Sequence, residues 1–158
     1  MTDAVVAILQ RHPFVEDFES QHVDKLAQMA VRVRFDRDQV IFREGGECSD
    51  FYLIASGLIA LEIAAPNHTF RVHTLTAGDE LGWSALLMGR GKHFQARALE
   101  RIEALAFDGG ELLAVCKQDT HFGFVFMHRL LGVVSERLQA ARLQLLDMHS
   151  PAAARAGT

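Results

Sequence analysis

The spacing of apolar residues changes twice along the chain and divides it into a helical, a β and a second helical part. Residues 4–10 are predicted to form a short apolar helix. Pro13 prevents the helix from continuing, because proline lacks the amide hydrogen that a helix interior requires. A second predicted helix begins near Ser20, which suits an N-cap. The apolar face of that helix consists of Val23, Leu26, Ala27 and Ala30.

From residue 31 to residue 108 the period of hydrophobicity is two, as in strands with one buried face. In the first strand, apolar Val31, Val33 and Phe35 alternate with Arg32 and Arg34. The predicted strands are residues 31–35, 51–54, 58–64, 70–75, 94–99 and 102–107. Several short strands with turn residues between them indicate an antiparallel β-sandwich or barrel.

After residue 108 the spacing becomes helical again, with a short helix at 111–117 and a long one at 122–148. Apolar residues of the long helix follow one another at intervals of four and three. This heptad stripe consists of Met127, Leu131, Val134, Leu138, Ala141, Leu145 and Met148. Such spacing is typical of helices that associate side by side, so we predict a homodimer through the heptad stripe.

The same helix carries a second apolar stripe that is expected to face the protein's own β-domain. It consists of Phe122, Phe126, Leu130 and Val133. The alternative is that the heptad stripe itself packs on the β-domain, in which case the helix forms no dimer. Beyond the helix, residues 149–158 are expected to be a disordered tail.

Composition limits the classes of function. The chain has 158 residues, of which 49% are hydrophobic, and this suits one folded domain. A net charge of −4 argues against non-specific nucleic-acid binding, which needs a basic face. No apolar run approaches the ~20 residues of a membrane span, and the N-terminus lacks the basic region of a signal peptide. We therefore expect a cytoplasmic domain that binds neither nucleic acid nor membrane.

The residues that usually carry chemistry are not grouped in the sequence. Cys48 and Cys116 are far apart and are expected to be free thiols in a reducing cytoplasm. His68 and His73 are five residues apart, and no His-x-His pair of the kind that holds metal in cupin jelly rolls occurs. No nucleophile elbow of the form Gly-x-Ser-x-Gly occurs either. We therefore expect neither a metal nor a catalytic residue.

Residues 41–57 carry the most informative pattern. Ile-x-Arg-Glu-Gly is followed by a short polar spacer and then by Tyr-Leu-Ile-x-x-Gly, which ends at Gly57. Gly45 and Gly46 suit a turn with positive φ. This order resembles the cyclic-nucleotide-binding domain family, which occurs in bacterial catabolite activators, kinase regulatory subunits and nucleotide-gated channels. The resemblance favours a sensor over an enzyme.

The resemblance also implies a fold. Family members have N-terminal helices, an eight-stranded jelly roll, a hinge helix and a long C-terminal helix, which is the order of elements predicted above. It implies one domain over residues 1–148, with the lead-in helices, jelly roll and hinge at 14–121 and the long helix at 122–148. The DNA-binding half of the catabolite activators is expected to be absent. The output would then pass to a protein partner or to the domain's own assembly.

A ligand site is implied at the phosphate-binding cassette, where helix N-terminal amides face the cyclic phosphate of the nucleotide. The family's glutamate binds the ribose and its arginine binds the phosphate. Here Trp83 stands at the place of the glutamate, and Lys92 or His93 at that of the arginine. The implied ligand-binding residues are Gly82, Trp83, Ser84, Ala85, Leu86, Arg90, Lys92, His93 and Arg97.

These departures lead to two hypotheses for the site. An indole donates a hydrogen bond but does not accept one, so cyclic AMP is expected to bind weakly. In the first hypothesis the domain senses a cyclic nucleotide or another small anion. In the second, Trp83 is core packing that fills the pocket, the basic residues are a solvated loop, and the domain is a structural or interaction module.

Overall fold

The computed structural model describes residues 2–43, 50–83, 86 and 94–149. The helices are α1 (Thr2–Arg11), the 3-10 helix η1 (Pro13–Val15), α2 (Ser20–Met29), α4 (Gly109–Gln118) and α5 (Thr120–His149). The strands are β1 (Val31–Phe35), β2 (Val40–Phe42), β3 (Asp50–Ser56), β4 (Leu58–Ala64), β5 (Thr69–Thr76), β6 (Glu80–Leu81), β7 (Gln95–Ala98) and β8 (Ile102–Asp108).

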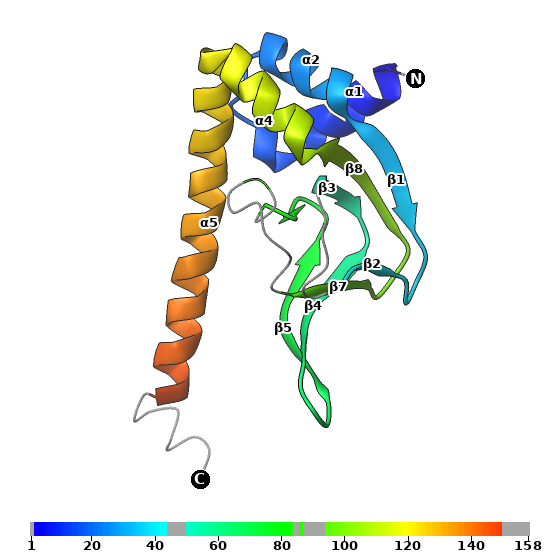
Figure 1. Ribbon diagram of the computed structural model, residues 1–158, viewed down its shortest axis with the longest axis vertical. Helices are drawn as coiled ribbons and strands as arrows, with labels where there is room; N and C mark the ends of the chain where they lie inside the picture. The colour runs from blue at the N-terminus through cyan, green and yellow to red at the C-terminus, as the bar shows by residue number, and fades with distance from the viewer. Residues whose placement is uncertain (1, 44–49, 84–85, 87–93, 150–158) are drawn as a thin grey trace.

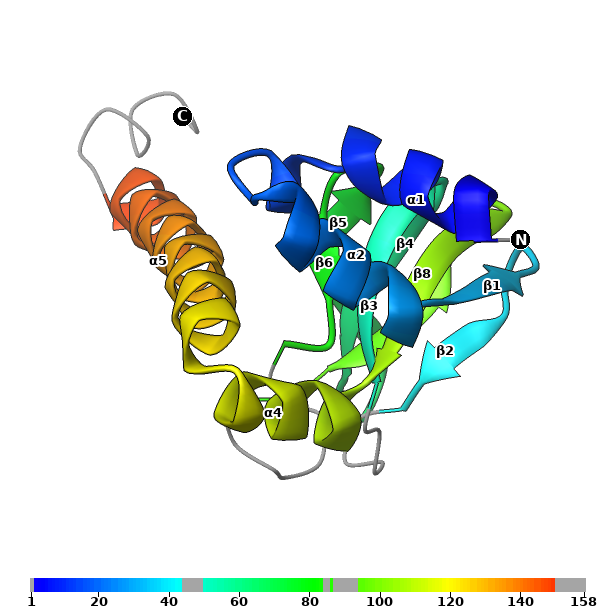
Figure 2. The ribbon, with the colours of Figure 1, turned by 90° about the horizontal axis from the view of Figure 1, so that it is seen from above.

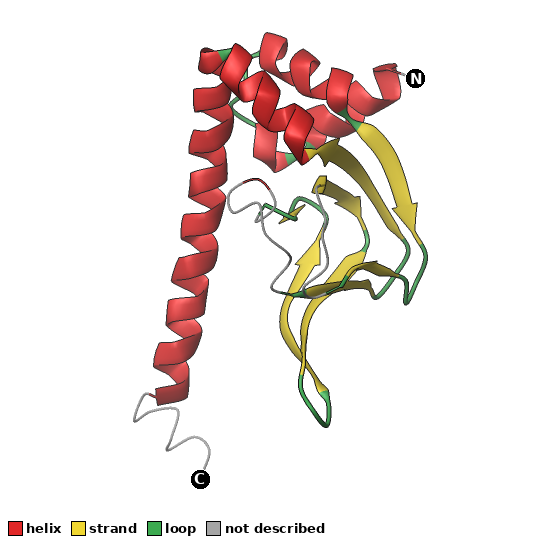
Figure 3. Cartoon of the chain, viewed as in Figure 1, coloured by secondary structure: helices red, strands yellow, loops and turns green. Residues whose placement is uncertain are grey.

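The strands form two four-stranded antiparallel sheets, in the orders β1-β8-β3-β6 and β2-β7-β4-β5. Together they make a β-roll. The shorter helices gather at one end of the roll, and α5 runs down one side of it (Figures 1 and 3). Seen from above, α1 and α2 lie over the end of the sheets while α5 stands beside them (Figure 2). The predicted class, a mainly β jelly roll with flanking helices and a long C-terminal helix, is confirmed.

Strand β3 is buried on both faces because two separate cores use its alternate residues. Phe51 and Leu53 belong to the core between the helices and the sheet, whereas Tyr52 and Ile54 belong to the core inside the roll. Successive side chains of a strand point to opposite faces, so one continuous apolar run serves both cores. This explains why the predicted strand at 51–54 has no polar alternation.

Phe14 joins three elements of the helical core. Its side chain is fully buried, and its ring centroid lies 5.7 Å from that of Phe51 on β3 and 5.3 Å from that of Phe126 on α5. The guanidinium of Arg129 on α5 donates to the Phe14 carbonyl at 3.1 Å and to the Pro13 carbonyl at 3.2 Å. Pro13 and Phe14 therefore hold the N-terminal half of α5 in place by both apolar packing and hydrogen bonds.

The turn between α4 and α5 is also fixed. One Asp119 carboxylate oxygen accepts from the Phe122 amide at 3.1 Å, and the other lies 2.6 Å from the Lys25 ammonium on α2. These contacts with Lys25 and the Phe122 amide lower the pKa of Asp119. Gly123 on α5 packs directly against the carbonyl of Cys116 on α4, so close that a side-chain Cβ would overlap that oxygen.

Several predicted details are corrected by the structure. Ser20 is the first residue of α2, and the N-cap is Glu19, which makes no side-chain capping bond. Helix α5 begins two residues earlier than predicted and includes His149, so the prediction of a disordered residue there is wrong. Residues 150–158, Gly45, Gly46 and Cys48 lie outside the described residues.

The alternation predicted for the outer strands does not bury all their apolar residues. Val31 on β1 is 60% exposed and Phe70 on β5 is 50% exposed. Both strands are sheet edges among the described residues, and the β4–β5 hairpin extends past the body of the roll (Figure 1). An edge strand lacks the neighbour that would cover it on one side, so its alternation does not by itself produce a buried face.

A pair of glycine substitutions on α5 tests the tight contact at the helical turn. Gly123→Ala places a methyl group against the Cys116 carbonyl, and we expect it to lower the free energy of unfolding by about 1–3 kcal/mol. At Gly132 an added Cβ has no neighbour within 4 Å, so Gly132→Ala should raise the free energy of unfolding by up to about 1 kcal/mol. Urea denaturation at one protein concentration compares the two. Equal effects would contradict this account.

Candidate ligand pocket

A cavity of about 310 Å³ lies between the β-roll and α5. Its walls come from β4, β5, α5 and the segments that follow β6 and precede β7. The lining residues are Leu61, Val72, His73, Trp83, Phe94, Arg137, Ala140, Ala141 and Gln144. Most of these side chains are apolar, and His73, Arg137 and Gln144 supply the polar groups. A largely apolar cavity with a few convergent polar groups is the usual form of a small-molecule site.

Trp83 is positioned by the turn that leaves β6. Gly82 has φ +87°, a left-handed conformation that other residues rarely adopt, and it directs the chain out of β6. Trp83 is half-buried; it packs against the helical core and forms part of the cavity wall. The Leu86 amide donates to the Trp83 carbonyl at 3.0 Å. The side chain of Leu86 is buried in the helical core, which leaves Trp83 as the predicted residue that lines the cavity.

The other predicted ligand-binding residues are placed as follows. Ser84, Ala85, Arg90, Lys92 and His93 lie outside the described residues. Gly82 shapes the turn, as described above. Arg97 lies on β7 and does not line the cavity. Apart from Trp83, therefore, the cavity wall that the structure describes is formed by residues that the sequence did not indicate.

Arg97 is engaged by carboxylates. Its Nη2 and Nε atoms lie 2.9 and 3.1 Å from the two carboxylate oxygens of Glu62, and its Nη1 lies 3.2 Å from Asp38. The guanidinium and the side-chain amide of Gln95 hold the pKa of the buried Glu62 below its usual value. A fork of this kind occupies the donors that would otherwise hold an anion. The role of Arg97 in anion binding stays a prediction.

A buried pair of charges links the strand before Trp83 to the long helix. The Arg137 guanidinium donates to the Glu80 carbonyl and lies 3.9 Å from the Glu80 carboxylate. Burial raises the pKa of Glu80 and lowers the pKa of Arg137. Because Arg137 also lines the cavity, a molecule bound there would contact the residue that joins α5 to β6.

One signal in the sequence could have identified the helical wall. Leu130, Arg137 and Gln144 are seven residues apart and therefore lie on one face of α5. Leu130 is buried against the roll, so the two polar residues that follow it at this interval also face the roll. The cavity-lining residues on the strands could not be identified from any comparable spacing in the sequence. His73 stands opposite Leu61 in the β4–β5 register, which only the fold defines.

His12 supports the same strand from the N-terminal side. Its Nδ1 accepts from the Phe14 amide at 3.1 Å, so the neutral ring carries its proton on Nε2, which donates to the Asp79 carbonyl at 3.2 Å. Asp79 directly precedes Glu80. Burial lowers the pKa of His12, since the charged ring would lose its hydration. The neutral histidine thus connects the end of α1 to the strand that leads to the cavity.

A roll of two antiparallel sheets, with helices at one end and a long C-terminal helix along its side, defines a jelly-roll domain with flanking helices. Residues 32–119 match the family model of the cyclic nucleotide-binding domain. The chain belongs to this family. It is a domain of the regulatory sensor kind, as the resemblance of residues 41–57 implied.

Solved structures support the same fold. A cyclic nucleotide-binding domain from Methylobacillus flagellatus superposes with a TM-score of 0.80 at 18% identity, covering 93% of this chain and 83% of that one. The catabolite activator protein of Thermus thermophilus gives a TM-score of 0.72 at 25% identity, covering 84% of this chain and 61% of that one. Both likenesses extend over most of the present chain.

A curated relative is an enzyme of much greater length. The cGMP-dependent 3′,5′-cGMP phosphodiesterase A of Dictyostelium discoideum is 25% identical over 113 residues, which is 72% of this chain and 12% of that protein. The likeness therefore concerns a small part of the phosphodiesterase and does not transfer its activity. In the part of this chain that the structure describes, no helix has the length and apolarity to cross a membrane. No group of three metal-ligating side chains is found in those same residues.

The role of His12 predicts a pH dependence of stability. Because its pKa is lower in the folded protein than the ordinary 6.5, the unfolded chain takes up the proton more readily. The free energy of unfolding should therefore fall as the pH falls from about 7.5 through 6.5. His12→Asn keeps an acceptor for the Phe14 amide but does not titrate, so the fall should be smaller. Denaturation at a series of pH values measures both slopes.

The exposed His149, at the end of α5, provides the control. His149→Asn should reproduce the wild-type slope. An unchanged slope in His12→Asn would show that the buried ring does not govern this pH range.

Proposed function

We propose that this domain is a non-enzymatic sensor that binds a small molecule in the cavity between the roll and α5. The observation that carries the proposal is the position of Trp83. Its half-buried side chain forms one wall of a cavity of about 310 Å³ and leaves that space open. This favours the sensor over a module whose pocket is filled by the indole. The ligand we propose is a cyclic nucleotide or another small anion.

Cyclic AMP should be a poor ligand of this site. The family's glutamate accepts a hydrogen bond from the ribose, and the indole that stands in its place donates only. At the position of the arginine that neutralises the phosphate the sequence has Lys92 or His93, with Arg90 two or three residues earlier, so that arginine is missing or displaced. Hydrogen bonds to charged groups contribute about 1.5–3 kcal/mol each. Loss of both would weaken binding by roughly two to four powers of ten relative to family members that keep both residues.

The signal is proposed to leave the cavity through α5. Ligand bound beside Arg137 competes with or strengthens its contact with Glu80, and either change alters the position of α5 relative to the roll. The output would reach a second copy of the domain or a protein partner, with no role for DNA or a membrane. A cytoplasmic location suits this function.

The proposed homodimer rests on the exposed face of α5. Phe124, Leu131, Leu138 and Leu145 are seven residues apart and are 69, 65, 52 and 57% exposed. Such a row of large apolar side chains is unusual on a surface that only meets water. Phe124 extends the predicted heptad stripe by one repeat and was missed in the sequence.

The rest of the heptad stripe lies nearer to the roll. Met127 packs partly on the helical core, Val134 is half-buried, and Ala141 lines the cavity. The second stripe meets the domain's own core as predicted, since Phe122, Phe126, Leu130 and Val133 are each less than 5% exposed. The interface we propose is therefore centred on the exposed residues at intervals of seven.

Binding can be followed through Trp83, because it is the single tryptophan of the chain. We expect cyclic AMP to change its fluorescence only at high concentration. The double substitution Trp83→Glu with Lys92→Arg restores the acceptor and the fork, and should bind more tightly by calorimetry. Trp83→Phe with Lys92→Arg keeps an aromatic wall without the acceptor and should gain less.

Two results would count against this proposal. Tight binding of cyclic AMP to the wild type would place the ribose away from Trp83. The second result is that cyclic AMP, cyclic GMP and inorganic phosphate leave the Trp83 fluorescence unchanged and native mass spectrometry finds no retained small molecule. This result would favour a structural or interaction module that binds no ligand.

Substitutions that place negative charges on the exposed heptad stripe of α5 test the proposed dimer. Leu131→Glu with Leu138→Glu should give a monomer in multi-angle light scattering at micromolar concentration, whereas the wild type should be a dimer. Leu143→Glu is the control. This leucine is 53% exposed on α5 and lies about 120–140° round the helix from Leu131 and Leu138, so this variant should stay dimeric. A monomeric wild type would refute the interface.

A further inference from the structure

A second hollow surface is lined by residues of α1, β1, β3 and β8. Strand β1 lies on the side of the roll away from α5 (Figure 1). Two cavities, of about 430 and 450 Å³, share Ile8, Ala55 and Glu103 in their walls. They therefore form one elongated groove between α1 and the sheet of β1, β8 and β3. We call it the arginine groove; the residues that define it are Ile8, Arg11, Arg32, Arg34, Ala55 and Glu103.

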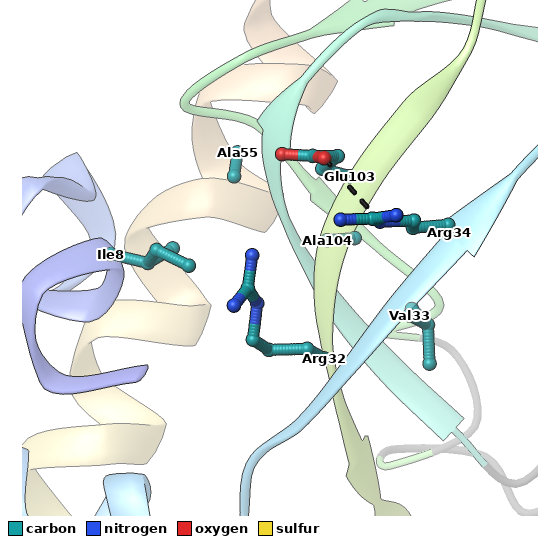
Figure 4. Close-up of a pocket in the computed structure, with 7 residues that line it drawn as sticks. All are labelled: Ile8, Arg32, Val33, Arg34, Ala55, Glu103 and Ala104. Carbon is teal, nitrogen blue, oxygen red and sulfur yellow. Dashed lines mark ion pairs between the residues drawn. The ribbon is translucent and has the colours of Figure 1, made fainter. Parts of the chain in front are cut away.

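The charge of the groove is opposite to that of the chain. Three arginines face one glutamate there, although the whole protein has a net charge of −4. Arg34 lies 3.5 Å from the Glu103 carboxylate. Arg11 and Arg32 have no ion-pair partner among the described residues. Figure 4 shows the Arg32 guanidinium extending into the hollow between Ile8 and the strands.

The groove runs beside an open strand. Within the described sheets β1 pairs with β8 alone, so its other edge has no neighbouring strand. Val31 on β1 is 60% exposed. An edge with β-branched residues and free backbone groups is a template for addition of another extended segment. Arg32 and Arg34 are two residues apart and so lie on one face of β1, beside the place where such a segment would run.

We infer that the arginine groove binds an acidic, extended segment of a partner protein, added to the edge of β1. The segment carries acidic side chains at alternate positions, because the spacing of Arg32 and Arg34 repeats every two residues. Its carboxylates pair with Arg32 and with Arg11, whose donors are free. The apolar side chains between them point to the opposite face of the sheet, on the side of the exposed Val31.

Two simpler roles of these arginines explain less of the surface. Charges on an edge strand often prevent aggregation, and Arg32 and Arg34 would serve that purpose alone. That role requires neither the groove nor the free Arg11, which comes from a different element. A compact anion such as phosphate would pair with the arginines but would leave the open edge of β1 and the exposed Val31 beside it without a partner.

The test uses the full chain and a fluorescent eight-residue peptide of alternating glutamate and valine. Fluorescence anisotropy should show saturable binding that weakens with salt. Arg32→Glu should weaken it by at least about tenfold, as expected for loss of a hydrogen-bonded charge pair. Arg32→Lys keeps the charge without the fork and should have an intermediate effect. Arg71→Glu, an exposed position on β5 of the other sheet, makes the same charge change and should have little effect.

A peptide of the same composition, with its glutamates and valines in separate blocks, tests the alternation and should bind more weakly. The inference is overturned if the wild type shows no saturable binding, if Arg32→Glu and Arg71→Glu weaken it equally, or if inorganic phosphate displaces the peptide at equal concentration of charge. None of these results bears on the ligand cavity, which lies beside α5 and is tested separately.

Discussion

The packing of Phe14 between β3 and α5 is the contact on which the rest of the structure depends. It holds the long helix against the roll at one level, and the same turn of chain supplies the carbonyls that Arg129 binds. Replacing such a buried ring by a methyl group costs about 3–5 kcal/mol in typical cores. The cavity has a helical wall because this contact sets the direction of α5 relative to the sheets.

C-terminal to this contact, less of α5 is buried against the rest of the domain. Val133 is the last residue of α5 that is buried in the core, and every residue from Leu138 to His149 is exposed. Between the two lies Arg137, whose contact with Glu80 bridges α5 and β6 across the cavity. Among the described residues, the helix is thus firmly held at its start and is joined to β6 further along by the polar contact of Arg137 with Glu80. Such an arrangement suits an element that must respond to a bound molecule.

The elements of the fold could be predicted from the sequence because each has a local period. The buried strand at 51–54 and the stripe of Phe122 and Phe126 on α5 are confirmed for that reason. The site could be predicted only at Trp83, which lies in a recognisable motif. The contacts of Arg137 with Glu80 and of Arg97 with Glu62 join residues 57 and 35 positions apart, and no local spacing encodes such pairs. The edge strands were misjudged because burial depends on which strands become neighbours.

The dependence of the core on α5 also determines when the protein can fold during synthesis. Phe122 and Phe126 complete the core around Phe14, and Arg137 and Gln144 complete the cavity. Until the ribosome has released these residues, the faces of Phe14 and Phe51 that later meet α5 stay exposed to water. The roll can assemble earlier, but it will be an incomplete intermediate that is open to aggregation. The cavity is therefore the last part of the domain to be completed, and a molecule that binds there would find its site only in the fully folded domain.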